Sequence, residues 1–424
     1  MAEVAKTLLD NGIRIISKRM PHLNSVSMGV WVAVGARDES LSESGMSHFI
    51  EHMIFKGTQR RTAFDIAKAF DAIGGQSNAF TAYENTCYHA KALDTHLETM
   101  VDILSDIVLN SLFDPNEIET ERPVIIQEIG MLEDSPEDLV HLLAGRQFWG
   151  DHPLGRPIIG SRDTVGRFQA RELKDFFRRV YQPRRLLIAA AGNLDHQRLV
   201  DLIALVFGSI RHRNGFGHRR PPTFAPGIKL TAKPLEQVHL CLSADGLPAD
   251  DPRRFAISLL NTVVGGNMSS RLFQNVRERR GLAYSVYSYA TAHQDAGLFG
   301  VYAGVAPRTA AKTTAVICDQ LRRLCDNPIS EPELAAAKAY VNGNLLLASE
   351  SNDNQMVRLA QNEITFGRHV PITEVVQGIA DVAPEDLTAL ANTLFQPDRM
   401  ALTVLGPLTG SDATATQFST AFEI

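Results

Sequence analysis

Cysteine is scarce in this chain, with four in 424 residues, and long apolar runs are absent. The cysteines are too few and too unevenly spaced for a disulfide framework, so we expect reduced thiols. Without a run of about 18 apolar residues the sequence predicts no membrane-spanning helix, and residues 1–10 do not resemble a secretory signal. A net charge of −6 gives no reason to expect a nucleic-acid partner. These absences predict a cytoplasmic protein.

The composition is that of an ordinary globular protein, with 44% hydrophobic and 21% charged residues. At 424 residues the chain is too long for one hydrophobic core. Its length therefore predicts two or three domains.

The most informative short pattern is His48-Phe49-Ile50-Glu51-His52, because histidines four positions apart share one face of a helix. Neutral imidazoles are common zinc ligands, and a neighbouring carboxylate can take a proton from water that a metal activates. This order of residues is the inverzincin signature. Chance would place it in such a chain roughly 2 times in 100. The alternative is an amphipathic helix with surface histidines, but the apolar residues 53–55 favour a packed helix.

Two pairs of segments repeat at a nearly constant spacing, which indicates an internal duplication. Residues 181–194 and 395–408 share an aromatic residue, Gln-Pro, an arginine, an apolar run and a glycine, at an offset of 214 (395 − 181). Helix starts at 114–117 and 330–333 match at an offset of 216 (330 − 114).

The duplication predicts a first domain over residues 1–209, a linker over 210–226 and a homologous second domain over 227–424. The linker is rich in glycine, proline and basic residues, so it is either a solvated connection or a patch for acidic partners. Strand-like and helical segments do not alternate strictly. We therefore predict the α+β class, with each domain a mainly antiparallel sheet and helices packed on one face.

Two glutamates downstream, Glu121 and Glu128, are seven positions apart and so share a helix face. The apolar residues 124–126 between them indicate a buried side, where a carboxylate needs a partner such as a metal ion. An exposed acidic face is the alternative. Pro123 predicts a kink or an interruption of this helix.

Residues 45–58 together with residues 121–128 resemble the pitrilysin, insulin-degrading enzyme and mitochondrial processing peptidase superfamily. This resemblance implies that His48, His52 and Glu128 bind one Zn²⁺ ion per chain and that Glu51 is the general base. It implies that Glu121 orients a ligand from behind. The same ligands can hold other divalent ions.

The resemblance extends over nearly the whole chain, including residues 152–160 and 276–284. It implies that Arg277 and Tyr284 of the second half face the metal and stabilise the oxyanion, although a tyrosine here could also be ordinary strand packing. It also implies that an exposed sheet edge containing Asn78, Ala79 and Phe80 binds the substrate strand. An ordinary hairpin strand is the alternative.

The resemblance implies a zinc metalloendopeptidase acting on peptides or unfolded segments in an enclosed chamber. Relatives that close a chamber in one chain are about twice this length, which predicts a homodimer, with a heterodimer as the alternative. Three competitors remain: a non-catalytic subunit, a peptide-binding subunit that needs a catalytic partner, and an unrelated zinc hydrolase. The intact motif argues against the first two.

Overall fold

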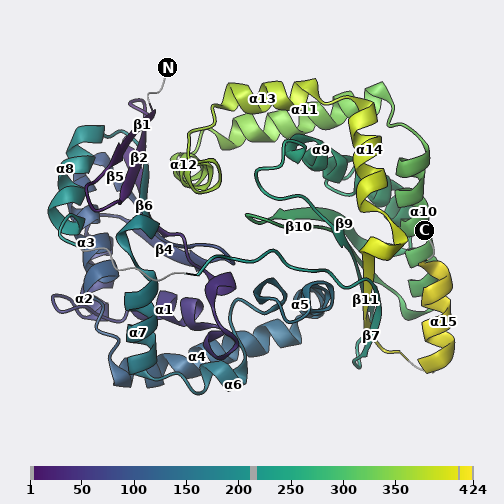
Figure 1. Cartoon of the computed structure of the whole chain (residues 1–424), viewed down its shortest axis with the longest axis horizontal. Helices are drawn as coiled ribbons and strands as arrows, with labels where there is room; N and C mark the ends of the chain where they lie inside the picture. Colours follow the sequence, from purple (N-terminus) through teal and green to yellow (C-terminus); the bar gives the residue numbers. More distant parts are fainter. Residues whose placement is uncertain (1–3, 211–216, 409–410, 423–424) are drawn as a thin grey trace. The chain divides into compact units, whose positions relative to one another are not determined.

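The computed structural model describes residues 4–210, 217–408 and 411–422, so segment 211–216 of the predicted linker lies outside the described residues. The chain forms two compact units (Figure 1). The first comprises Met1–Gly130, Arg156–Arg219 and Leu346–His369, and the second comprises Met131–Gly155, Arg220–Leu345 and Val370–Ile424. The units therefore differ from the predicted stretches 1–209 and 227–424, because each takes in a segment from the other half of the sequence.

A six-stranded sheet organises the first unit, with the strand order β1-β2-β6-β3-β5-β4. Neighbouring strands are antiparallel except β2 and β6, which are parallel. The strands are β1 (Val4–Leu8), β2 (Arg14–Arg19), β3 (Ser25–Val32), β4 (Gln76–Thr81), β5 (Thr86–Leu93) and β6 (Leu186–Gly192).

A layer of helices covers one face of this sheet. Alternate residues of β3, from Val26 to Val32, point into the core that these helices form. Such alternation with a helical layer is the predicted arrangement. The helices are α1 (Met46–Ile54), α2 (Ala63–Ala72), α3 (Leu97–Asn110), α4 (Pro115–Asp134), α6 (Arg162–Val165), α7 (Ala170–Val180) and α8 (His196–Phe207).

A single helix from the second half of the sequence, α12 (Asn352–Phe366), covers the opposite face of the first sheet. Its Met356 packs against Trp31, whose indole Nε1 donates a hydrogen bond to the Met356 sulfur at 3.3 Å. Gly29 permits this approach, because a Cβ atom there would lie 2.9 Å from that sulfur. The sequence did not predict this second layer.

The second unit repeats the topology, with the strand order β7-β11-β8-β10-β9. Its parallel pair, β7 and β11, corresponds to β2 and β6 of the first sheet. The strands are β7 (Gly227–Ala232), β8 (Val238–Asp245), β9 (Ala283–Ala292), β10 (Gly297–Val305) and β11 (Met400–Gly406). This shared order of strands confirms two similar α+β domains.

Helix α5 (Pro136–Trp149) from the first half packs on the second sheet, as α12 does on the first. The two are counterparts in the duplication, because their N-cap residues Ser135 and Ser351 are 216 positions apart (351 − 135). The other helices of this unit are α9 (Arg254–Val264), α10 (Ala310–Asp326), α11 (Glu331–Ala348), α13 (Ile372–Asp381), α14 (Pro384–Leu394) and α15 (Ser411–Ala421). No described helix is long and apolar enough to cross a lipid bilayer.

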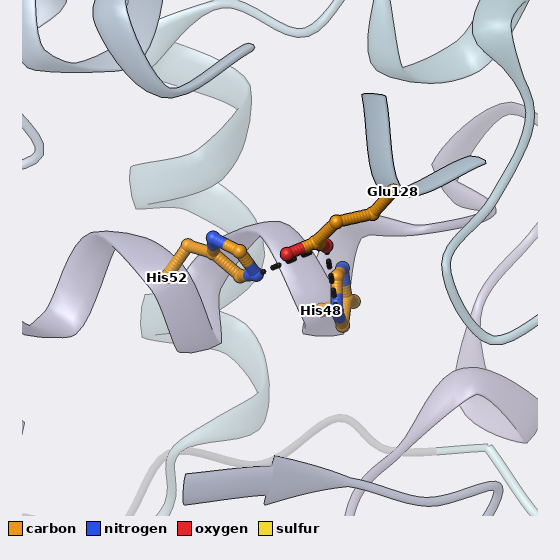
Figure 2. Close-up of side chains that lie close together, drawn as sticks. All are labelled: His48, His52 and Glu128. Atoms are coloured by element: carbon orange, nitrogen blue, oxygen red, sulfur yellow. Dashed lines mark ion pairs between the residues drawn. The ribbon is translucent and has the colours of Figure 1, made fainter. Parts of the chain in front are cut away.

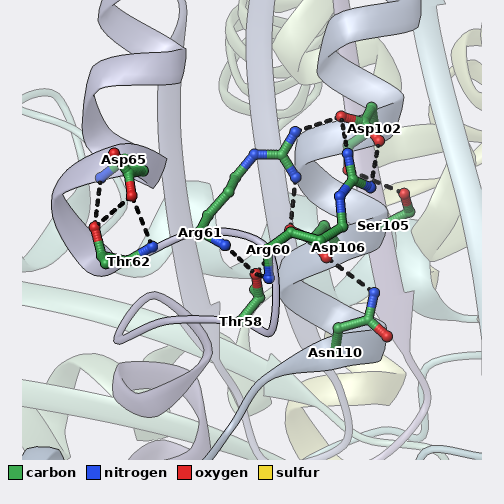
Figure 3. Close-up of polar contacts among 9 residues, drawn as sticks. All are labelled: Thr58, Arg60, Arg61, Thr62, Asp65, Asp102, Ser105, Asp106 and Asn110. Atoms are coloured by element: carbon green, nitrogen blue, oxygen red, sulfur yellow. Dashed lines mark hydrogen bonds and ion pairs between the residues drawn. The ribbon is translucent and has the colours of Figure 1, made fainter.

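Hydrogen bonds and ion pairs connect the loop that follows α1 to helix α3 (Figure 3). Thr58 donates a hydrogen bond to the buried carboxylate of Asp106 at 2.8 Å, and Arg61 pairs with the same group at 2.6 Å. Arg60 makes a bidentate pair with Asp102 at 2.8 and 3.0 Å. These contacts hold the segment that follows α1 against α3.

Candidate metal centre

The histidine motif lies on α1, an amphipathic helix of nine residues. Phe49, Ile50 and Met53 are buried in the core of the first unit, and this fixes the rotation of the helix about its axis. The side chains of His48 and His52 then share the less buried face, because four residues make about one turn.

Helix α4 brings a third ligand to these histidines, as Figure 2 shows. Oε2 of Glu128 lies 3.8 Å from Nε2 of His48 and 3.5 Å from Nε2 of His52. Within the described part of the chain, this is the one group of three or more histidine, cysteine or acidic residues whose ligand atoms converge within 4.8 Å. The structure therefore brings together all three residues of the predicted metal set.

The arrangement fits a catalytic zinc ion. Zinc–nitrogen and zinc–oxygen bonds of about 2.0–2.2 Å in a tetrahedron place ligand atoms roughly 3.3–3.5 Å apart, close to the observed separations. Two imidazoles and one carboxylate leave a fourth position open, as in zinc hydrolases. Nε2 is the ligand atom that His48 offers, because it is the ring nitrogen that faces Glu128, whereas Nδ1 is buried without a hydrogen-bond partner among the described residues.

Glu121 orients His52 from behind. It accepts a hydrogen bond from Nδ1 of His52 at 2.8 Å, which leaves Nε2 free to face Glu128. Lys56 forms an ion pair with the other oxygen of Glu121. Burial opposes ionisation of Glu121, but the hydrogen bonds from Lys56 and His52 outweigh it and hold its pKa below the ordinary value. The carboxylate is thus kept charged behind the ligand.

Glu51 lies on α1 between the two histidines, and its side chain reaches the end of strand β4. Thr81, the last residue of that strand, donates a hydrogen bond to Oε2 of Glu51 at 2.5 Å. Burial raises the pKa of Glu51, and the bond from Thr81 and the nearby His52 only partly offset that rise. A carboxylate with a raised pKa is a better proton acceptor, which suits a general base.

Asn78, Ala79 and Phe80 lie on β4, which is an edge strand paired only with β5. Asn78 is exposed, whereas Phe80 packs edge-on against Trp31 with ring centroids 5.4 Å apart. The outer backbone edge of β4 therefore has no partner strand among the described residues. This is the geometry that strand addition needs.

Arg277 and Tyr284 belong to the second unit, whereas the metal ligands belong to the first. Arg277 lies in a π-helical segment, Phe273–Glu278, and its guanidinium carbon is 5.0 Å from the centroid of the Tyr284 ring. Tyr284 is 80% exposed.

A β-bulge places Tyr284 at the surface. Gly304 of β10 pairs with Ser285 and Val305 pairs with Ala283, so Tyr284 is the extra residue between them. Bulges and π-helical turns concentrate at functional sites, where they redirect a side chain. An exposed tyrosine at such a position is unlike ordinary strand packing.

Sequence reasoning missed Thr81 and Lys56. Lys56 is four positions after His52, so helical spacing could have suggested it, whereas nothing local links Thr81 to Glu51. Of the kink or interruption predicted at Pro123, the interruption was wrong, because α4 continues from Pro115 to Asp134 with Pro123 inside it. Arg122 anchors the helix there by donating hydrogen bonds to the carbonyl groups of Val165 and Phe168.

The metal-free protein should lose stability as the pH falls below about 6.5. Burial, together with His52, lowers the pKa of His48 from 6.5 to about 4. Between these pH values the unfolded chain binds a proton at His48 that the folded chain does not bind. The contribution of His48 to the free energy of unfolding is therefore fully present above pH 6.5 and declines toward pH 4. The difference between the two pKa values of His48 corresponds to about 3 kcal/mol in the free energy of unfolding. Denaturant unfolding at pH 7 and pH 4.5 with a chelator should show a smaller decline for His48→Gln; an equal decline would contradict this.

Two family models match this chain: insulinase, peptidase family M16, over residues 14–162, and the peptidase M16 inactive domain over residues 167–341. An uncharacterized zinc protease of Streptomyces coelicolor is 39% identical, with 97% of this chain and 91% of the relative covered. The uncharacterized zinc protease YmxG of Bacillus subtilis is also 39% identical, with 94% and 97% covered.

The fold is that of solved peptidase structures. A protease from Helicobacter pylori superposes with a TM-score of 0.89 at 21% identity, covering 96% of this chain and 100% of the other. At this level of sequence identity, the similarity shows a shared fold. The matching family model and the relatives named as zinc proteases place the chain among peptidases. The chain belongs to the insulinase family, peptidase family M16.

Proposed function

We propose that this protein is a zinc-dependent metalloendopeptidase that hydrolyses peptides or unfolded, presequence-like segments in an enclosed chamber. The observation that carries the proposal is the convergence of His48, His52 and Glu128, with Glu51 beside them. A zinc ion held there would supply a Lewis acid for the peptide carbonyl and lower the pKa of a water molecule. The names of the zinc protease relatives support the same metal.

Glu51 is the proposed general base. Its carboxylate takes a proton from the attacking water and then delivers it to the leaving amine, a role that contributes about 10²–10⁴-fold to such reactions. Thr81 holds one oxygen of Glu51, so the other remains available for the proton. Both residues are fixed by regular structure, which limits the reorganisation that proton transfer requires.

Arg277 and Tyr284 are the proposed oxyanion-stabilising groups. A cationic guanidinium and a phenolic hydroxyl can both donate hydrogen bonds to the oxygen on which negative charge develops. Their mutual contact and the exposure of Tyr284 support this role.

Replacing Tyr284 by Phe should lower kcat by about 10²–10³-fold and leave the zinc content unchanged, because it removes one donor to the oxyanion. Steady-state kinetics and metal analysis measure the two quantities. Tyr340→Phe is the matched control, since Tyr340 is a partly exposed tyrosine of α11 in the same unit. Loss of zinc from the Tyr284 variant would show that the residue was misassigned.

The substrate is proposed to add as an extra strand to β4, next to Asn78, Ala79 and Phe80. Backbone hydrogen bonds give this mode of binding its affinity and keep it tolerant of sequence. It would place the scissile bond near Glu51, because Thr81 connects β4 to that side chain.

We further propose a homodimer, because one chain carries both the metal residues and the Arg277–Tyr284 pair. Light scattering should then give a mass of about 93 kDa, twice the 46.6 kDa of one chain. A monomer in isolation would favour a heterodimer with another subunit. The cytoplasmic location predicted from the sequence stays a prediction.

Mass-spectrometric detection of cleavage tests the proposed activity. The purified protein should cleave an unstructured peptide, and a chelator should stop the reaction, with added zinc restoring it. Absence of cleavage by the zinc-loaded protein would contradict a self-sufficient peptidase. The alternative, a non-catalytic or partner-dependent subunit, would then hold.

A further inference from the structure

Glu39 is a buried carboxylate beside the metal helix, and the proposed chemistry does not use it. Only 4% of the residue is exposed. It precedes α1 in the chain, between the short turns Ala36–Asp38 and Leu41–Glu43. A buried carboxylate is costly unless its oxygens are fully partnered.

Both oxygens of Glu39 bind the first turn of α1. Oε2 accepts a hydrogen bond from the backbone N–H of Gly45 at 2.8 Å, and Oε1 accepts one from the N–H of Ser47 at 2.6 Å. The N-cap residue of α1 is Gly45, which has no side chain to cap the helix itself. Glu39 therefore supplies, from outside the helix, the cap that α1 lacks.

The backbone around Glu39 is tied to the turn after β4. Ala36 N–H donates to Ala82 O at 3.1 Å, and Arg37 N–H donates to Tyr83 O at 2.7 Å. Glu39 thus joins the N-terminal end of α1 to the strand that carries Thr81, the partner of Glu51.

The backbone of Glu39 is held as well. Arg156 donates a hydrogen bond from Nη2 to the carbonyl oxygen of Glu39 at 2.6 Å. Burial raises the pKa of Glu39, whereas the N–H groups of Ser47 and Gly45, which donate to both oxygens, and the charge of Arg156 favour the ionised form. The side chain of Glu39 is thus a buried hydrogen-bond acceptor, and both of its donors belong to the start of α1.

We propose that Glu39 is a positioning residue for the metal centre. By capping α1 it fixes the first turn against the β4 side of the site, so that His48, which follows Ser47 directly, and His52, one turn later, meet Glu128 at ligand distance. The inference rests on the metal site of the proposed function but not on peptide hydrolysis.

Glu39→Gln tests this role, because the amide keeps the size of the side chain but presents an N–H₂ group to one of the two backbone donors. Glu43→Gln is the matched control: Glu43 accepts from Ser40 N–H at 3.0 Å and pairs with Arg179 at 2.5 Å, and neither partner belongs to α1. For each variant, three quantities are measured: the zinc dissociation constant by chelator competition, amide hydrogen exchange of α1 in metal-free protein, and kcat at saturating zinc.

We expect Glu39→Gln to weaken zinc binding by about 10–100-fold, as the loss of a group supporting a ligand typically does. It should also speed exchange in the first turn of α1, whereas Glu43→Gln should change the zinc dissociation constant by less than about twofold. A lower Tm with unchanged zinc binding in Glu39→Gln would overturn the proposal. If that variant does not fold, Glu39→Asp, which is one methylene shorter, should weaken zinc binding, and unchanged binding would again overturn it.

The zinc-binding measurements test the role of Glu39 whether or not the protein cleaves peptides. Wild-type protein that binds zinc without cleaving peptides would contradict the proposed function, yet the zinc affinities of the two variants would still decide the role of Glu39.

Discussion

Replacing Glu51 by Gln should reduce kcat by about 10²–10⁴-fold while zinc stays bound, because the amide cannot accept a proton from water. Gln keeps the shape of the side chain and can still accept the hydrogen bond from Thr81, which is 2.5 Å in the wild type. The geometry of α1 should therefore persist. The measurement pairs kcat on a fluorogenic peptide with zinc content by elemental mass spectrometry.

The control for this prediction is Glu119→Gln, a change of the same kind at a largely exposed position of α4. It should leave kcat within about twofold. Near-normal turnover by Glu51→Gln would reject the general-base role. Loss of zinc would instead make Glu51 part of the metal set.

Zinc affinity should fall much further in Glu128→Gln than in Glu121→Gln. Glu128 supplies an oxygen that faces both histidines, at 3.5 and 3.8 Å, so its loss removes a charged ligand. We expect a weakening of roughly 10³-fold or more, against about 10–100-fold for Glu121, which only orients His52. The two residues lie on the same helix seven positions apart, which makes them a matched pair.

Competition with a chelator of known affinity gives both dissociation constants. Equal losses would mean that both carboxylates bind the metal, and a larger loss for Glu121 would exchange their roles. His48→Ala should resemble Glu128→Gln, since it also removes a ligand.

The local part of the site was predictable, and the distant part was predictable only through family resemblance. His48, Glu51 and His52 follow from helical spacing alone, because their geometry is set within one turn. Glu128 is 76 positions after His52 (128 − 52), and no periodicity spans that distance. Thr81 and Glu39 reach α1 only through the fold, so nothing in their local sequence marks them.

The duplication and the α+β class were also readable from the sequence, but the exchange of helices was not. Strand β6, Leu186–Gly192, is apolar throughout and buried on both faces. Such a run signals a sheet covered on both sides. It does not say which helix supplies the cover, and α12 comes from more than 150 residues further along (352 − 192 = 160).

That exchange has a consequence for the nascent chain on the ribosome. The last strand of the first sheet, β6, ends at residue 192, but the helix that covers Trp31, Cys87 and Leu187 ends at residue 366. At 5–20 residues per second, the 174 residues between them (366 − 192) take roughly 9–35 s to synthesise. Throughout that interval one apolar face of the sheet is open to solvent, a surface that chaperones bind. Release of a truncated chain before residue 366 should therefore favour aggregation.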